Sequence, residues 1–596
     1  MHLTPNPGRT RIWTLATALA FGTACGSGQL PQNTMHDPEF EGFDDLGVNG
    51  SALTDLSGQC DYASGFVTLT LQSGNIAVLS KTALGEVAVN GYPCGDATTT
   101  NTKNIAVVED TGSTGAETLV IDYLPGMFAT GRTSTVGIAV DLGTGSDSLR
   151  FRGTTGNDKW VLGQSGLAVN TDSNVDVTYA NVEEVIFSLG PGNDTFSAAG
   201  GTGGAGAALT SSITIYGGSG NDTLRGGDGD DVIYGGEGND TFTSGALADG
   251  ADDIHGGAGT DVMDYSARTA SVTVTIDGNA DDGAVGETDN INTDVENLKG
   301  GHGDDSLTGS AQDNVIWGGP GADSISGGDG DDTLNGDAGD DTFLCGTSTD
   351  GADIFSGGAG IDTVDYSSRT ATLTITINGT ANDGEDGEND NVKTDVENVY
   401  GGSGPDDITG SSGNNILEGR AGNDTIHGGA GNDTIRGGAG NDTLYGDAGN
   451  DTFDEEDSSN GSDTMAGGIG TDTVDYSART NDLTITLTST NTDGETNEGD
   501  DVGSDVENVL CGDGDDDVTG SDSNNVIDGG AGNDTLSGGA GNDVISGGSG
   551  TDTIDGGEGD DEIDGDGGTD SIDCGAGDGD ICADPADCAS ATACEL

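Results

Sequence analysis

Blocks of nine residues with the pattern Gly-Gly-x-Gly-x-Asp-x-apolar-x recur along most of this chain. The block at 217–225 is followed without a gap by blocks at 226–234 and 235–243, so that Asp222, Asp231 and Asp240 share slot six. The glycines permit positive φ and a tight turn. The apolar residue in slot eight, such as Leu224, begins a very short strand and is the side chain that we expect in the core. Such tandem repeats predict a solenoid whose coils bury their apolar side chains against their neighbours.

The composition indicates that this solenoid needs bound cations. The chain has 106 acidic and 16 basic residues, a formal net charge of −90, and only 31% hydrophobic residues. A chain so charged and so poor in apolar side chains is expected to stay disordered by itself. The slot-six carboxylate lies beside the carbonyl oxygens of the glycine turn, and Ca²⁺ takes six to eight such oxygens. We therefore expect multiple Ca²⁺ ions to bind as the chain folds.

Two other interpretations of the composition are disfavoured. A disordered, acidic, glycine-rich coil would not keep slot eight at Leu, Ile, Val or Phe in nearly every block. A nucleic-acid partner is also disfavoured, because phosphate binding requires Lys and Arg.

The blocks closely resemble the RTX, or haemolysin-type, calcium-binding repeats of exported bacterial proteins, between residues 142 and 573 with interruptions. The resemblance implies an all-β fold, a parallel β-roll or β-solenoid, in which two nonapeptides make one coil and Ca²⁺ lies between coils. The isolated blocks with Asp261, Asp362 and Asp472 are weaker candidates, because a single block lacks the flanking coil that completes a site. The metal ligands that the resemblance implies are Asp222, Asp231, Asp240, Asp305, Asp323, Asp332, Asp341, Asp406, Asp424, Asp433, Asp442, Asp451, Asp516, Asp534, Asp543, Asp552, Asp561 and Asp570.

A longer period lies over the nonapeptides. The hexapeptide Asp-Tyr-Ser-Ala-Arg-Thr at 264–269 returns at 365–370, with one change, and at 475–480. The tetrapeptide Asp-Val-Glu-Asn at 294–297 returns at 395–398 and 505–508. Each module also has an alternating Thr/Val/Ile strand and an acidic loop. The loops at 281–289 and 383–390 are further calcium candidates, although a solvated acidic loop is the interpretation that we favour.

These patterns divide the chain into nine segments. The strand-rich N-terminal region is expected to continue the same solenoid without metal. The segments are a signal peptide (1–24), a flexible tether (25–55), a strand-rich β region (56–140), a degenerate repeat region (141–215), three repeat modules (216–315, 316–416 and 417–526), a terminal repeat run (527–573) and a Cys-rich C-terminal cap (574–596).

The N-terminus is typical of an export signal. Arg9 and Arg11 precede an apolar stretch at 12–21, which is too short to span a bilayer. Small residues then precede Cys25, which resembles the lipobox of bacterial lipoproteins. The resemblance implies lipidation of Cys25 and anchoring in the outer membrane, with plain secretion as the alternative. We expect an extracellular or cell-surface location.

The cysteines fit an oxidising compartment. Cys60 and Cys94 bracket a strand-rich segment and can pair, whereas Cys345 and Cys511 fit free, buried thiols. Four cysteines crowd the last residues and predict two disulfides, Cys574–Cys594 enclosing Cys582–Cys588. A zinc site is the weaker alternative there, because no His is near and the spacings are not paired Cys-x-x-Cys.

No catalytic motif is recognisable. The chain lacks His-Glu-x-x-His and Gly-x-Ser-x-Gly, and its five His are scattered. We therefore expect a non-enzymatic, calcium-binding exported or surface protein. An adhesin or partner-binding module, and a polysaccharide-acting enzyme within residues 56–200, are the alternatives. A cleft with clustered carboxylates or His in that segment would favour the enzyme.

Overall fold

The computed structural model describes residues 56 and 59–583, apart from gaps at 65, 73, 85, 100–101, 111–114, 124–136, 170–174, 202–204, 488–491 and 578. The described residues belong to one compact unit, Thr54–Leu596. The predicted signal peptide, Cys25 and the cysteines at 588 and 594 lie outside the described residues. No helix within the described part has the length and apolarity needed to cross a membrane.

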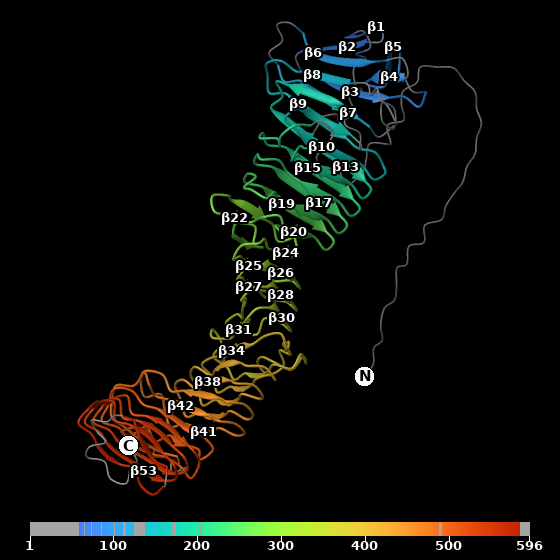
Figure 1. Ribbon diagram of the computed structural model, residues 1–596. Helices are drawn as coiled ribbons and strands as arrows, with labels where there is room; N and C mark the ends of the chain where they lie inside the picture. The colour runs from blue at the N-terminus through green and yellow to red at the C-terminus, as the bar shows by residue number, and fades with distance from the viewer. Residues whose placement is uncertain are drawn as a thin grey trace, which may run out of the picture. The chain divides into compact units, whose positions relative to one another are not determined.

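The described chain is a parallel β-solenoid, which confirms the predicted fold class (Figure 1). Equivalent residues of successive coils are 18 positions apart within a run, as for Asp222 and Asp240. The spacing is 21 where a loop lengthens the coil, as between Asp240 and Asp261. Two nonapeptides therefore make one coil, as predicted.

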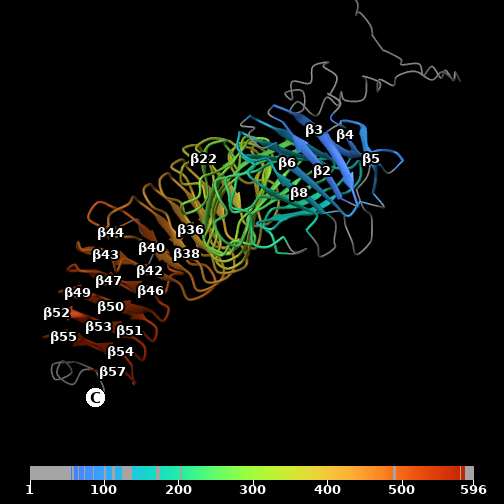
Figure 2. The ribbon, with the colours of Figure 1, turned by 90° about the horizontal axis from the view of Figure 1, so that it is seen from above.

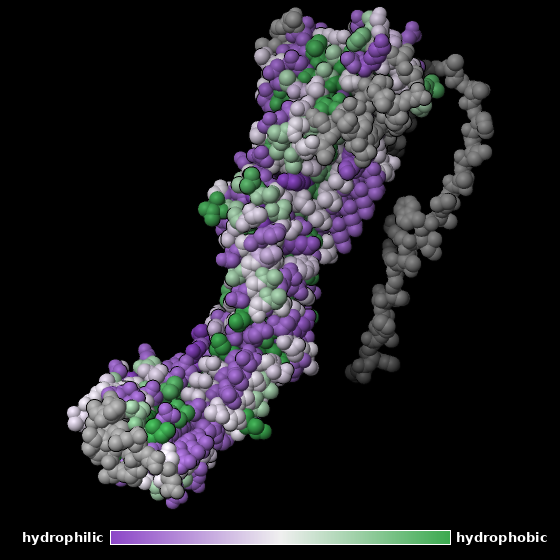
Figure 3. Space-filling view, in the orientation of Figure 1, coloured by the Kyte–Doolittle hydropathy of each residue, from purple (hydrophilic) through white to green (hydrophobic). Residues whose placement is uncertain are grey.

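Slot-eight side chains form the core. Leu224, Phe242, Met263, Leu298 and Ile316 follow one another in parallel register, and all five are buried. Most of the residues that flank them are partly or fully exposed, although Asn297 beside Leu298 is buried. Each short strand therefore contributes one apolar side chain to the core. The face shown in Figure 3 is accordingly mainly hydrophilic.

Two ladders of parallel strands begin in the N-terminal region. The first is β2 (Phe66–Leu71), β6 (Asn104–Glu109), β8 (Gly137–Asp141) and β12 (Val177–Ala180). The second is β3 (Ile76–Lys81), β7 (Thr118–Asp122), β9 (Ser148–Arg152), β13 (Glu184–Pro191), β15 (Thr214–Ser219), β17 (Val232–Glu237), β19 (Asp253–Ala258) and β23 (Asp289–Ile291). Because the second ladder continues into the nonapeptides, the N-terminal strands and the repeats form one solenoid.

Antiparallel strands cover the N-terminal end of these ladders. They are β1 (Cys60–Ala63), β4 (Glu86–Val89) and β5 (Tyr92–Thr98). The disulfide Cys60–Cys94 joins β1 to β5, with 5.5 Å between the Cα atoms. A further antiparallel strand, β11 (Gly166–Val169), connects β12 to the third ladder.

Two longer ladders carry most of the repeats. The third is β10 (Lys159–Gly163), β14 (Thr195–Ser197), β16 (Thr223–Arg225), β18 (Thr241–Thr243), β20 (Val262–Asp264), β24 (Asn297–Lys299), β26 (Val315–Pro320), β28 (Thr333–Ala338), β30 (Ile354–Ala359) and β33 (Asn391–Val392). The fourth is β21 (Val272–Thr275), β25 (Ser306–Thr308), β27 (Ser324–Ser326), β29 (Thr342–Leu344), β31 (Thr363–Asp365), β34 (Asn398–Tyr400), β36 (Ile416–Glu418), β38 (Thr434–Arg436), β40 (Thr452–Asp454), β42 (Thr473–Asp475), β46 (Asn508–Leu510), β48 (Val526–Asp528), β51 (Val544–Ser546), β54 (Glu562–Asp564) and β57 (Ile581–Cys582).

The last two long ladders complete the C-terminal coils, and Figure 2 shows β43, β47, β50 and β53 side by side. The fifth ladder is β32 (Thr374–Thr376), β35 (Asp407–Thr409), β37 (Thr425–His427), β39 (Thr443–Tyr445), β41 (Thr464–Ala466) and β45 (Asp501–Val502). The sixth is β43 (Leu483–Thr486), β47 (Asp517–Thr519), β50 (Thr535–Ala540), β53 (Thr553–Glu558) and β56 (Ser571–Asp573). The short strands β22 (Ala280–Ala284) and β44 (Gly494–Glu495) pair antiparallel with β21 and β43, and β49 (Ala531–Gly532), β52 (Ser549–Gly550) and β55 (Gly567–Gly568) form a small sheet of their own.

The 100-residue period has a structural meaning. In each module one ladder ends, at β23, β33 or β45, and a new ladder begins, at β21, β32 or β43. The hexapeptide, the extra strand and the acidic loop lie at this change, which we call the seam of the module.

Candidate metal centres

A hydrogen-bonded row of slot-six aspartates runs along the coils. The amide of Asp194 donates to Asp222 Oδ1 at 2.6 Å, Asp222 N donates to Asp240 Oδ1 at 2.7 Å, and Asp240 N donates to Asp261 Oδ1 at 2.7 Å. Each carboxylate therefore fixes the turn of the preceding coil through one oxygen. The same bond recurs in the later modules, for example from Asp433 N to Asp451 Oδ1 at 2.8 Å.

The second oxygen of the carboxylate is the functional one. Asp222 Oδ2 is buried and has no hydrogen-bond partner. A Cβ built on Gly217 would lie 2.5 Å from both this atom and the carbonyl oxygen of Gly235, so the two oxygens face the same small space. Gly218, with φ of 111°, gives the turn its shape. Two buried oxygens without a proton between them repel unless a cation joins them.

Most of the predicted ligands have this arrangement. Their Oδ2 atoms are buried and without a hydrogen-bond partner, which fits a hard cation such as Ca²⁺. They are Asp222, Asp240, Asp323, Asp332, Asp341, Asp424, Asp433, Asp442, Asp451, Asp516, Asp534, Asp543, Asp552 and Asp561. Asp570 is also buried, and its Oδ1 accepts from Asp552 N at 2.8 Å.

Three predicted ligands differ. The Oδ2 atoms of Asp231, Asp305 and Asp406 accept hydrogen bonds from the backbone amides four residues earlier, at 2.6, 2.5 and 2.8 Å. The slot-two N–H thus satisfies this oxygen, although a Cβ built on Gly300 or Gly401 would still meet both the aspartate Oδ2 and the carbonyl oxygen of Gly318 or Gly419. The shared nonapeptide pattern does not reveal this difference, because it depends on how the slot-two amide is turned.

The structure adds aspartates to the predicted set. Asp194, Asp261, Asp362, Asp463, Asp472 and Asp580 also have buried Oδ2 atoms without a hydrogen-bond partner. Asp261, Asp362 and Asp472 continue the rows, so the expectation that their blocks lack a neighbouring coil is wrong. The blocks of Asp463 and Asp580 lack the leading Gly-Gly pair and keep only one glycine of the pattern, Gly461 in slot four and Gly575 in slot one.

Burial disfavours the charged form of these aspartates. It is the main cause that raises the pKa of Asp222 to about 6, of Asp332 to about 7 and of Asp463 to about 8, from an ordinary value of 3.8. Neighbouring carboxylates add to the shift, as Asp240 does for Asp222. A cation at these positions therefore competes with protons near neutral pH.

Backbone oxygens must supply much of the coordination. Within the described ranges, no group of three or more His, Cys, Asp or Glu side chains is placed to hold a metal ion. The Gly217 turn instead combines one carboxylate oxygen with carbonyl oxygens, a donor set that Ca²⁺ accepts and that suits transition metals poorly.

The acidic loops are not simply solvated. Asp282, Asp289 and Glu287 are buried, as are their counterparts in the other modules. Asp282 accepts from the amides of Thr275 and Ile291 at 2.7 and 2.9 Å. The favoured interpretation of a solvated loop is thus wrong for these carboxylates, because backbone amides and one arginine take their charge.

That arginine comes from the repeated hexapeptide. Arg268, only 1% exposed, contacts Glu287 at 2.7 Å and also Asp249, while the Tyr265 hydroxyl donates to Asp289 Oδ2 at 3.0 Å. We call this group and its two repeats the buried arginine clusters. The sequence shows the hexapeptide but not its role; the return of Arg at one position in all three copies, in a chain with 16 basic residues, is the available signal.

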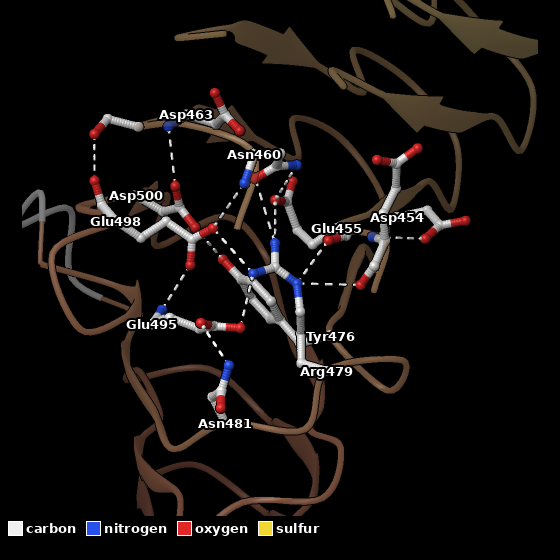
Figure 4. Close-up of polar contacts among 12 residues, drawn as sticks. Asp454, Glu455, Asn460, Asp463, Tyr476, Arg479, Asn481, Glu495, Glu498 and Asp500 are labelled. Carbon is white, nitrogen blue, oxygen red and sulfur yellow. Dashed lines mark hydrogen bonds and ion pairs between the residues drawn. The ribbon is translucent and has the colours of Figure 1, made fainter. Parts of the chain in front are cut away.

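Figure 4 shows the third cluster, around Arg479. Its Nε donates to the Glu455 carbonyl oxygen at 2.8 Å, and its Nη1 to Glu498 Oε1 at 3.0 Å and Glu495 Oε1 at 3.3 Å. The Tyr476 hydroxyl donates to Asp500 Oδ2 at 2.8 Å. These contacts pair the arginine with several seam carboxylates, whereas Glu455 Oε1 is buried and has no hydrogen-bond partner.

The predicted cysteine sites are placed as follows. Cys60 and Cys94 form a disulfide, and Cys574 and Cys582 are each disulfide-bonded. The proposed nested pairing involves Cys588 and Cys594, which lie outside the described residues, as does Cys25. Cys345 and Cys511 are free and buried.

Coils with rows of buried, unpaired carboxylate oxygens on a parallel β-solenoid define a class of protein that binds cations between its coils. The model of the RTX calcium-binding nonapeptide repeat matches residues 216–249, 248–267, 292–325, 308–343, 347–365, 400–435, 427–454, 457–477, 512–545 and 546–581. These segments of the chain therefore carry RTX calcium-binding nonapeptide repeats. No curated protein matches it.

Proposed function

We propose that this protein is a non-enzymatic, exported or surface-attached solenoid that folds by binding many Ca²⁺ ions. The observation that carries the proposal is the row of buried Oδ2 atoms without hydrogen-bond partners, most of which face a carbonyl oxygen of the next coil. Leaving so many carboxylate oxygens buried and unpaired is costly, and Ca²⁺ removes that cost at every coil. Because no such site exists in the unfolded chain, the binding free energy is also folding free energy.

The disulfides support export. The Cys60–Cys94 bond and the bonded Cys574 and Cys582 are typical of an oxidising compartment. Outside the cell calcium is abundant, and extracellular sites bind it at about 10⁻⁴–10⁻³ M. The chain would then stay extended in the calcium-poor cytoplasm and fold after export. A thiol-reactive reagent added to the unfolded, unreduced mature protein tests this: among the described cysteines only Cys345 and Cys511 should react, whereas reaction at Cys60 or Cys94 argues against export.

The carboxylates of the N-terminal region support a structural role. Asp147 Oδ1 accepts from Glu117 N at 2.8 Å, and Asp194 Oδ1 accepts from Asp158 N at 2.6 Å. These buried acids hold one coil to the next, as the slot-six aspartates of the repeats do. They are therefore poor candidates for an acid–base pair in an enzyme acting on polysaccharides.

A calcium titration of the mature chain, dialysed free of metal at low salt, tests the proposal. Circular dichroism should gain β-structure with added Ca²⁺, and equilibrium dialysis should count many bound ions per chain. Equal Mg²⁺ is the control, because Mg²⁺ screens charge similarly but demands a tighter octahedral site. Full β-structure without divalent ions, together with no calcium uptake, would overturn the proposal.

A further inference from the structure

In each of the three repeat modules, one row of slot-six aspartates ends on a residue that no glycine turn follows in the next coil. These are Asp261, Asp362 and Asp472, and each is 0% exposed. Their Oδ2 atoms are buried and have no hydrogen-bond partner. Within a run, the slot-one carbonyl of the next coil faces this oxygen. The end of the run therefore needs a different oxygen to act as the metal-ion donor.

The Asp-Val-Glu-Asn tetrapeptide supplies that donor. A Cβ on Gly235 would meet Asp240 Oδ2 and the carbonyl oxygen of Gly256, whereas a Cβ on Gly256 would meet Asp261 Oδ2 and the carbonyl oxygen of Asp294. The Asp294 carbonyl thus takes the place of a slot-one glycine carbonyl. The same replacement occurs in the other modules, with Asp362 Oδ2 and the Asp395 carbonyl beside Gly357, and with Asp472 Oδ2 and the Asp505 carbonyl beside Gly467.

The glutamate of the tetrapeptide replaces the next slot-six aspartate. Asp261 N donates to Glu296 Oε2 at 2.7 Å, as Asp240 N donates to Asp261 Oδ1. The equivalent bonds are Asp362 N to Glu397 Oε2 and Asp472 N to Glu507 Oε2, both 2.9 Å. The buried Val295, Val396 and Val506 anchor the tetrapeptide in the core. It therefore reproduces the oxygen positions of a nonapeptide turn without its glycines.

The first residue of the tetrapeptide also brings a carboxylate that a glycine cannot. Asp294 Oδ2 accepts from Gly257 N at 3.1 Å, while Oδ1 is buried without a hydrogen-bond partner. Asp395 Oδ1 is likewise buried and without a hydrogen-bond partner. In the third copy Asp505 Oδ2 accepts from Gly468 N at 3.1 Å. Two carboxylates and a carbonyl are a richer oxygen set than one turn within a run offers.

We propose that the tetrapeptide completes a Ca²⁺ site at the end of each run, formed by Asp261 with Asp294, Asp362 with Asp395, and Asp472 with Asp505. The inference rests on the proposed calcium binding of the repeats and adds sites outside the nonapeptide pattern. These sites join the last coil of a run to the seam that follows it. Calcium would then link each module across the point where the repeats are interrupted.

A triple variant of the full chain tests these sites: Asp294→Asn, Asp395→Asn and Asp505→Asn. The amide oxygen of Asn keeps the bond from the slot-two amide, and its NH₂ group then faces the site, which repels a cation. Equilibrium dialysis with Ca²⁺ should count three fewer ions than in the wild type. The matched control carries Asn at the exposed Asp281, Asp386 and Asp457, which removes the same charge and should leave the count unchanged.

A crystal structure of the wild-type chain grown in Ca²⁺ gives a second measurement, through the anomalous signal of calcium. Density between Asp261 and Asp294 is expected, and it would decide the matter even if the triple variant failed to fold. An unchanged ion count in a folded triple variant, or calcium within the runs but none at their ends, would overturn the inference alone. A wild-type chain that takes up no calcium would overturn the proposed function instead.

Discussion

The backbone amide of Asn415 donates to Asp433 Oδ1 at 2.7 Å, one coil further along the chain. Asp433 thus has one oxygen engaged in holding two coils together and one oxygen that is buried and unpaired. The two oxygens of a slot-six carboxylate have different tasks, and mutations can address them separately.

Replacing Asp433 with Ala removes both the acceptor of the bond between coils and the buried, unpaired oxygen. Coupling in a solenoid is mainly between neighbouring coils, so we expect the loss of about one or two ions and no general unfolding in saturating calcium. Equilibrium dialysis and circular dichroism measure the two effects. The control is Asn432→Ala, next in sequence and exposed. Identical ion counts and calcium midpoints for the two variants would show that Asp433 is not a ligand.

The opposite outcome is expected for the three aspartates whose Oδ2 atoms accept a backbone hydrogen bond, Asp231, Asp305 and Asp406. Asp305 accepts from Val272 N at 2.8 Å and from Gly301 N at 2.5 Å, so both of its oxygens are satisfied. Asp305→Asn should therefore leave the ion count unchanged while lowering stability by about 1–3 kcal/mol, because one buried amide loses its acceptor. Asp323→Asn, one coil further, should lower the count. If Asp305→Asn lost an ion as well, Gly301 N would not be the partner of that oxygen in the loaded protein.

The buried arginine clusters predict a calcium-independent contribution to stability. Arg369 Nη2 lies 2.6 Å from Asp350 Oδ1 and 2.8 Å from Glu388 Oε1, and its side chain is fully buried. Arg369→Met leaves these carboxylates without their cation, which costs about 3–5 kcal/mol. Urea unfolding in saturating calcium measures the change.

The control for Arg369 is an arginine–glutamate ion pair at the surface. Arg150 lies 3.3 Å from Glu184, whose side chain is 53% exposed. Arg150→Met should change the free energy of unfolding by about 0–1 kcal/mol. Similar losses for the two variants would mean that the Arg369 cluster contributes no more than an exposed ion pair.

The sequence predicts the repeat and leaves its interruptions unexplained. Slot eight and slot six are local patterns, so residues such as Leu224 and Asp222 could be assigned to the core and to the metal row in advance. Arg369 and Glu388 are 19 positions apart, and only the fold of the seam brings them together. The prediction of a solvated loop is wrong at these carboxylates, because the sequence shows their charge but not the buried arginine that lies beside them in the fold.

The same limit explains the errors among the aspartates. Asp231 and Asp240 occupy identical slots, yet Asp231 Oδ2 accepts from Gly227 N and Asp240 Oδ2 has no hydrogen-bond partner. The pattern does not identify Asp463, because its block has lost the leading Gly-Gly pair, although its carboxylate continues the row by accepting from Asp442 N at 2.7 Å. The row of aspartates therefore continues through coils in which the nonapeptide pattern is incomplete.

The raised pKa values predict opposite pH effects with and without calcium. In the metal-free fold, burial raises the pKa of Asp433 to about 6 and those of Asp424 and Asp534 to about 7, from 3.8. The metal-free folded state thus binds more protons than the unfolded chain between pH 3.8 and about 7. Its stability, as far as these groups set it, is greatest at the acid end and is lost as pH rises through 6–7.

Calcium reverses this dependence, because it binds the deprotonated form and releases protons. The calcium midpoint should therefore move to higher concentration as pH falls below 7. Circular dichroism of protein dialysed free of metal, compared at pH 5 and pH 8 without a chelator, tests the first effect, and titrations at both pH values test the second. More β-structure at pH 8 than at pH 5 in metal-free protein would contradict the predicted sign.

The last prediction concerns a coil whose slot-six residue is Asn instead of Asp. In slot six of its block, Asn415 Oδ1 accepts from Ser411 N at 2.7 Å, and its Nδ2 donates to the Glu397 carbonyl oxygen at 2.6 Å. Asn314 and Asn525 make the same two bonds in the other modules. An N–H group thus stands where an aspartate would oppose that carbonyl with a second oxygen.

Asn415→Asp replaces the donor with a carboxylate oxygen of nearly the same shape. Without calcium, this oxygen and the Glu397 carbonyl repel, and stability should fall by about 1–3 kcal/mol. With calcium, the new carboxylate oxygen and the Glu397 carbonyl oxygen form a pair that a cation can join, and we expect about one additional ion per chain. Equilibrium dialysis measures the additional bound ion. Urea unfolding with and without calcium measures how the substitution changes the free energy of unfolding in each condition. The matched control is Asn432→Asp, which adds the same charge at an exposed position and should add no ion. An equal count for both variants would show that the second oxygen of slot six does not by itself create a site, and the row of buried oxygens would then need another explanation.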